Sequence, residues 1–126
     1  MFSTTQVIAV AVGGAFGSVL RFGLSSWVQS VAGRGFPYGT ISVNVIGCFL
    51  MGALFVWLIE RGDNAVWTAG VLVGVLGGFT TFSAFSMDTL RLIESGEIAP
   101  AFMNVTASVV LCLGATWLGL LLARST

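Results

Sequence analysis

Four long segments without a single charged side chain constrain this sequence more than any other feature. They cover residues 1–20, 35–59, 64–87 and 98–123, and each is 20 to 26 residues long. A helix of about 20 apolar residues crosses the hydrocarbon core of a bilayer. Only 8% of the residues are charged, and the mean hydropathy is +1.01. The sequence therefore predicts an all-α integral membrane protein with four transmembrane helices.

The predicted helices leave little room for anything else. We expect a single four-helix transmembrane domain over residues 1–126, with helices at about 6–31, 40–59, 66–93 and 99–123. The first apolar segment lacks the basic start of a signal peptide, so we expect it to be retained. Four short helices enclose almost no pore by themselves, which predicts an oligomer.

One stretch of the third apolar segment is a poor continuous helix. Residues 77–86 read GGFTTFSAFS. Paired glycine costs about 1–2 kcal/mol relative to alanine in a helix interior, and adjacent threonines lose rotamer freedom and bond to nearby backbone. Unwound backbone is tolerated in a membrane only where protein buries it or water reaches it. Two interpretations remain open: a helix broken near its middle at an ion site, and a close helix crossing permitted by glycine.

Two ionisable residues fall inside or beside the apolar segments. Arg21 lies deep in the first expected helix, where an arginine pairs, snorkels or faces water. Snorkelling to the interface and a structural ion pair are both open for it. Asp88 lies near the far end of the third helix, and it has two candidate partners, Arg21 and the nearby Arg91.

Polar side chains mark the second and fourth helices. Asn44 is the one strongly polar side chain of the second, and its amide serves either as interhelical glue or as pore lining. Small polar residues recur every fourth position in the fourth helix, which favours a wet or interhelical face: Asn104, Ser108, Cys112 and Thr116. Neither Cys48 nor Cys112 has metal-site or CxxC spacing, so we expect two small buried residues.

The four arginines other than Arg21 give no orientation bias, and Arg21 would add slightly to the Arg34 side if it snorkels. Four spans place both termini on one side of the membrane, together with Arg61 and Arg124, whereas Arg34 and Arg91 lie on the other side. The positive-inside rule therefore favours neither orientation. Our hypothesis is that copies insert both ways and form an antiparallel dual-topology homodimer.

Neutral donors dominate the apolar segments. The sequence has no histidine, no nucleophile with a base beside it, no phosphate-binding loop and no basic patch for nucleic acid. We therefore expect no enzyme. Amide and hydroxyl groups and phenylalanine ring edges suit a small anion on a passive pathway. Carbonyls released at the break in the third helix suit a cation.

Three motifs together resemble a known family over nearly the whole chain. They are residues 13–17 (GGAFG) with Arg21, Gly39-Thr40 with Val43-Asn44 and Gly47, and residues 77–86. The sequence resembles the Fluc (CrcB-type) fluoride channels of bacteria. This resemblance implies passive export of fluoride through two pores of an antiparallel dual-topology homodimer in the bacterial inner membrane.

The resemblance also assigns roles to individual residues. Phe82 and Phe85 match pore phenylalanines that contact fluoride by their edges, and Asn44 matches a pore-lining amide. The carbonyls of Gly77 and Thr80 match ligands of a structural sodium ion at the dimer centre. Ser83 and Ser108 match polar positions beside the pore. Arg21 matches the arginine of the family's first helix.

Some positions depart from the family pattern, and two other functions remain as alternatives. Ala84 replaces a common threonine, Asn104 a tyrosine of some members, and Cys112 a serine of others. A small dual-topology proton-coupled drug exporter would need an acidic residue in the first helix, which has none. A non-transporting membrane subunit would explain the glycines but not the donors around Phe82.

Overall fold

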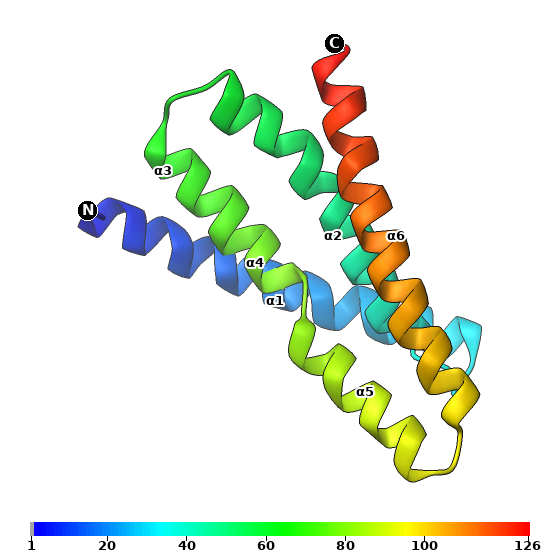
Figure 1. Cartoon of the computed structure of the whole chain (residues 1–126). Helices are drawn as coiled ribbons and strands as arrows, with labels where there is room; N and C mark the ends of the chain where they lie inside the picture. The colour runs from blue at the N-terminus through cyan, green and yellow to red at the C-terminus, as the bar shows by residue number, and fades with distance from the viewer. Residues whose placement is uncertain (1) are drawn as a thin grey trace.

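The computed structural model describes residues 2–126, and all regular elements in that range are helical (Figure 1). Met1, the first residue of the expected domain, lies outside the described residues. The elements in order are α1 (Thr4–Ala32), α2 (Tyr38–Phe55), the π-helical η1 (Val56–Glu60), α3 (Ala65–Thr68), the π-helical η2 (Ala69–Leu76), α4 (Gly77–Phe79), α5 (Phe82–Glu94) and α6 (Ile98–Arg124).

These elements form four spans that are long and apolar enough to cross a membrane. The spans are Thr4–Ala32, Tyr38–Glu60, Ala65–Glu94 and Ile98–Arg124. The prediction of an all-α chain with four membrane-spanning helices is confirmed, and the protein is a multi-pass membrane protein. The third span is assembled from α3, η2, α4 and α5.

Side-chain caps define where the helices begin. Ser3 and Gln6 form a capping box at α1, in which the Ser3 N–H donates to Gln6 Oε1 at 2.7 Å. Asn64 Oδ1 accepts from two backbone N–H groups at the start of α3. Thr81 Oγ1 accepts from the Ala84 N–H at the start of α5. Each cap satisfies donors that have no partner within the helix.

Helix α1 packs closely along η2 and α4 (Figure 1). Gly13 and Gly17 of α1 are buried, and a Cβ atom on Gly17 would collide with the Val75 carbonyl. A Cβ atom on Gly78 would lie 2.7 Å from the Gly14 carbonyl oxygen. Small residues on both helices thus allow backbone contact, which is how helices associate without a hydrophobic driving force in lipid.

Helix α2 packs along α6, the orange to red helix of Figure 1. A Cβ atom on Gly52 would collide with the Thr116 carbonyl, and one on Gly119 with the Phe49 carbonyl. At the end of this contact Arg124 Nη2 lies 2.5 Å from Glu60 Oε2. This is the one ion pair formed within residues 2–126.

Two residues of the third span have extended rather than helical backbone. Thr80 has φ −89° and ψ 159°, and Thr81 has φ −152° and ψ 119°. Helix α4 therefore stops at Phe79 and α5 starts at Phe82, with the chain drawn as a thin link between them in Figure 1. The polar groups of these two residues need partners from outside their own helix.

Candidate functional site

Asn44 supplies the partners for the extended backbone of Thr81. Its Nδ2 donates to the Thr81 carbonyl at 3.0 Å, and its Oδ1 accepts from the Thr81 N–H at 2.7 Å. Thr81 is buried, with 9% of its surface exposed. One side chain of α2 thus satisfies both backbone groups of a residue that has left the helix. Of the two roles left open for Asn44, the interhelical one is directly visible in this contact.

The same contacts divert the helical donors of two carbonyl groups. In a continuous α-helix the carbonyl of residue i accepts from the N–H of residue i+4. The Thr81 N–H donates to Asn44 instead of the Gly77 carbonyl, and the Ala84 N–H donates to Thr81 Oγ1 at 3.1 Å instead of the Thr80 carbonyl. The carbonyls of Gly77 and Thr80 therefore lose their usual donors. Such carbonyl oxygens are suitable ligands for Na⁺.

The first turn of α5 presents aromatic rings beside a hydroxyl group. The ring centroids of Phe82 and Phe85 are 5.3 Å apart, with an angle of 48° between the planes. Phe82 is 78% exposed in the single chain. The exposed Ser83 places its Oγ 3.2 Å from Thr81 Oγ1. Electropositive ring edges and a hydroxyl donor are thus available on one short segment.

A second polar row connects α5 to α6. Asn104 is only 1% exposed, and its Nδ2 donates to Thr89 Oγ1 at 2.9 Å. Thr89 Oγ1 donates to the Phe85 carbonyl at 2.8 Å. Ser108 Oγ lies 3.4 Å from Asn104 Oδ1, to which it donates. Asn104 and Thr89 were not among the predicted site residues. The four-residue repeat that contains Asn104 and Ser108 did indicate that this side of α6 faces water or another helix.

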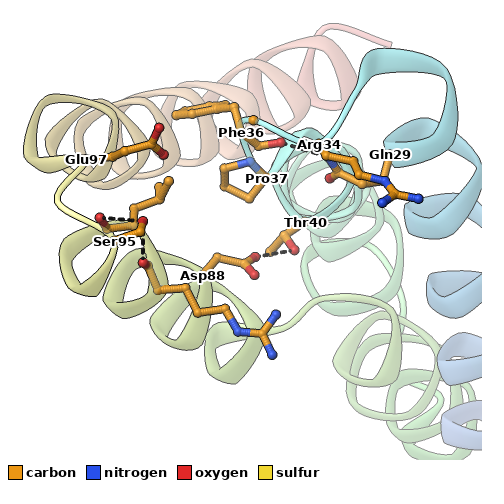
Figure 2. Close-up of a pocket in the computed structure, with 11 residues that line it drawn as sticks. Gln29, Arg34, Phe36, Pro37, Thr40, Asp88, Ser95 and Glu97 are labelled. Carbon is orange, nitrogen blue, oxygen red and sulfur yellow. Dashed lines mark hydrogen bonds between the residues drawn. The ribbon is translucent and has the colours of Figure 1, made fainter.

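A cavity of about 430 Å³ opens where the α1–α2 loop meets the turn between α5 and α6. Figure 2 shows Thr40 and Asp88 facing each other in it, and Thr40 Oγ1 donates to Asp88 Oδ2 at 2.8 Å. Gln29 holds the loop in place through the Phe36 carbonyl and the Gly39 N–H. The charged side chains lining the cavity are Arg34, Asp88, Arg91 and Glu97.

In the part of the chain that the structure describes, Asp88 and Arg21, the two residues predicted to have structural roles, do not form the ion pairs considered for them. Within residues 2–126, Asp88 forms an ion pair with neither Arg21 nor Arg91, and its carboxylate bonds to Thr40. Arg21 lies half-buried on α1. The expected depth of the residues in the membrane suggested Arg21 and Arg91 as partners of Asp88. It gave no information on Thr40, whose hydroxyl the start of α2 places beside Asp88.

The predicted pore residues lie on two polar clusters. Asn44 and Ser83 both adjoin Thr81. Ser108 belongs to the row with Asn104, which reaches the backbone of Phe85 through Thr89. The two clusters meet on α5, whose first residues carry both phenylalanine rings. This arrangement places neutral polar side chains beside α5 at Ser83 and at Thr89.

The sequence matches the family described as "CrcB-like protein, Camphor Resistance (CrcB)" over residues 8–120. It is 46% identical over 119 residues to "Fluoride-specific ion channel FluC" of Geobacter metallireducens, covering 94% of this chain and 96% of that protein. The protein of the same name from Geobacter sulfurreducens is 47% identical, covering 95% of this chain and 98% of its own. That from Methylococcus capsulatus is 50% identical, covering 94% of this chain and 53% of its own.

The Asn44–Thr81 contact predicts a stability effect. Asn44→Ala leaves the N–H and C=O of Thr81 without partners, and an unsatisfied buried polar group costs about 1–3 kcal/mol. We expect a lower thermal midpoint in detergent and faster hydrogen exchange at the Thr81 amide. Ser86→Ala is the matched control, because Ser86 Oγ bonds only within its own helix, to the Phe82 carbonyl. Equal stability of the two variants would contradict a stabilising role for the Asn44–Thr81 hydrogen bonds.

Proposed function

The chain belongs to the CrcB-like protein family, and on that premise we propose that it is a passive fluoride-selective ion channel in a bacterial inner membrane, and not an enzyme. The observation that carries the proposal is identity of 46–50% to three proteins named fluoride-specific ion channels, over 94–95% of this chain. The site supports it, because neutral donors and ring edges gather on α5 and its neighbours.

In the proposed pathway, fluoride exchanges its hydration water for protein donors in stages. Asn44 Nδ2 has two N–H groups, and only one is needed for the Thr81 carbonyl. The second N–H and the hydroxyl of Ser83 replace water molecules, and the Ser108 hydroxyl does so by exchanging its 3.4 Å bond to Asn104 for one to fluoride. Fluoride then passes the edges of Phe82 and Phe85, where the ring quadrupole is positive. No fixed positive charge is required, so the ion is not trapped.

A second copy of the chain completes this pathway in our proposal. Phe82 and Ser83 are exposed in the single chain, and the Thr80–Thr81 backbone between them and α4 is extended. Lipid does not satisfy the Ser83 hydroxyl or the Thr80 carbonyl, whose helical donor bonds to Thr81 instead, so this face requires protein or water. The even split of arginines between the two sides favours an antiparallel, dual-topology partner. Such a dimer would contain two equivalent pores.

The carbonyls of Gly77 and Thr80 would hold a structural sodium ion between the two copies. They fit this ion because their helical donors are diverted to Asn44 and Thr81. Carbonyls of unwound transmembrane helices are known ligands for Na⁺. The ion would supply positive charge that neutralises facing carbonyl dipoles and joins the subunits.

A proton-coupled carrier is the second candidate. Asp88 is the observation that favours it, because this carboxylate lines the 430 Å³ cavity together with Arg91. Carriers place acidic residues along their substrate path. However, α1, α2 up to Phe55 and α6 contain no Asp or Glu, so a proton relay across the membrane lacks members. The passive channel therefore accounts better for the chain.

Replacement of the ring pair predicts a loss of flux. Phe82→Ile and Phe85→Ile remove the electropositive edges but keep apolar bulk. We expect fluoride efflux from liposomes to fall by about tenfold or more, since about 1.4 kcal/mol of added barrier is a factor of ten in rate. Phe102→Ile is the control, because Phe102 lies 75% exposed on α6 and outside both polar clusters. Normal flux in both α5 variants would refute the ring-edge role.

The sodium proposal predicts stabilisation by a specific cation. Exchanging Na⁺ for N-methyl-D-glucamine at constant ionic strength should lower the thermal midpoint of the dimer. A ligand at 100 times its Kd stabilises by about 2.7 kcal/mol, so the midpoint should rise with Na⁺ concentration and then saturate. Lithium and potassium salts serve as controls for ion size. A midpoint independent of Na⁺ would exclude the site while leaving the fluoride pathway untested by this experiment.

A further inference from the structure

The register between α2 and α6 is defined at two separate levels. Near the end of both helices, Arg124 Nε and Nη2 donate to the carboxylate of Glu60, 64 residues earlier in the chain. Two turns before that, Gly52 fits against the backbone carbonyl of Thr116, which has the same sequence separation. The helices therefore run parallel, and Gly52 and Glu60 of α2 each lie beside the α6 residue 64 positions later. Gly119 of α6 fits between Phe49 and Ala53 at the same contact.

The same register brings Cys48 beside Cys112. Each residue lies one helical turn before a defined contact, Cys48 before Gly52 and Cys112 before Thr116. Neither cysteine is in a disulfide, and both are half-buried. Each thiol is among the groups that surround the other. Gly52 and Gly119 allow the helix backbones to touch about one turn further along. The two cysteines therefore lie where α2 and α6 are close together, and a disulfide requires such a close approach.

The surroundings of this pair determine what could react with it. On α6, Leu111 and Leu113 are 49% and 68% exposed and flank Cys112 on the apolar surface. No charged residue lies on α2 between Tyr38 and Phe55 or on α6 before Arg124. A bound metal ion would carry charge into this apolar region, which is costly. A disulfide is neutral, and it needs only the two thiols that are already adjacent.

We propose that Cys48 and Cys112 form a dithiol site that neutral, lipid-soluble disulfides oxidise to an intramolecular disulfide between α2 and α6. One cysteine attacks the reagent and forms a mixed disulfide, while its proton is transferred to the expelled reagent thiol, so that no net charge is left in the apolar region. The second cysteine then attacks the mixed disulfide, forming the Cys48–Cys112 bond and expelling the second reagent thiol. The two cysteines are oxidised, and the reagent is reduced.

The bond would restrain the helices that carry the polar clusters. Asn44 lies one turn before Cys48 on α2, and Ser108 lies one turn before Cys112 on α6. Oxidation would therefore fix the separation of α2 and α6 next to the side chains that bind Thr81 and Asn104. The dithiol site itself does not depend on which ion the protein conducts.

The test treats the purified protein in liposomes with 4,4′-dithiodipyridine and measures both pyridinethione absorbance and intact mass. We expect two equivalents of pyridinethione per chain, a mass lower by two hydrogen atoms, and full reversal by dithiothreitol. Chains that retain one or two pyridyl adducts, or that do not react, would overturn the proposal.

Two kinds of variant separate pairing from mere reactivity. Cys112→Ser leaves Cys48 without a partner, so one pyridyl adduct should remain and one equivalent of pyridinethione should be released. The double variant Cys112→Ser/Leu113→Cys keeps two thiols but moves one to the exposed face of α6, so it should retain two adducts. If this double variant formed the intramolecular disulfide as completely as the parent chain, the assigned register would be contradicted.

Discussion

The exchange of hydrogen bonds between Asn44 and Thr81 is the interaction on which the site depends. Unsatisfied backbone groups cost several kcal/mol each in a bilayer, so a chain leaves its helix there only if partners exist. Asn44 provides both partners from α2. Thr81 can then cap α5 through its hydroxyl, which sets where the second helical segment begins and where Phe82, Ser83 and Phe85 are presented.

Close packing by glycine holds the helices that make this exchange. Gly13, Gly17 and Gly78 bring α1 against the third span, and Gly52 and Gly119 bring α2 against α6. Lipid tails are as apolar as leucine, so helix association depends on contact and hydrogen bonds rather than on burial from water. The polar rows of α5 and α6 and the Glu60–Arg124 pair add specific bonds to these contacts.

The sequence predicts the spans well because charge is excluded from lipid, and uncharged length is visible in a sequence. Partner choice is not visible in that way. Asn44 was equally suited to glue and to pore lining until the Thr81 backbone was located, and Asp88 was matched with arginines although Thr40 binds it. The π-helical η2 shifts the helical period, which residue spacing does not reveal. The proposed Cys48–Cys112 pair could not be predicted from residue spacing, because its two members lie on different helices.

The most direct test of the account measures ion efflux from liposomes that contain the purified protein and are loaded with fluoride or with chloride. A fluoride electrode and a chloride electrode follow the two ions under the same membrane potential. The account predicts rapid fluoride loss that needs no proton gradient, with chloride retained. Slow, saturating or proton-dependent fluoride loss, or equal loss of chloride, would contradict a passive fluoride-selective channel.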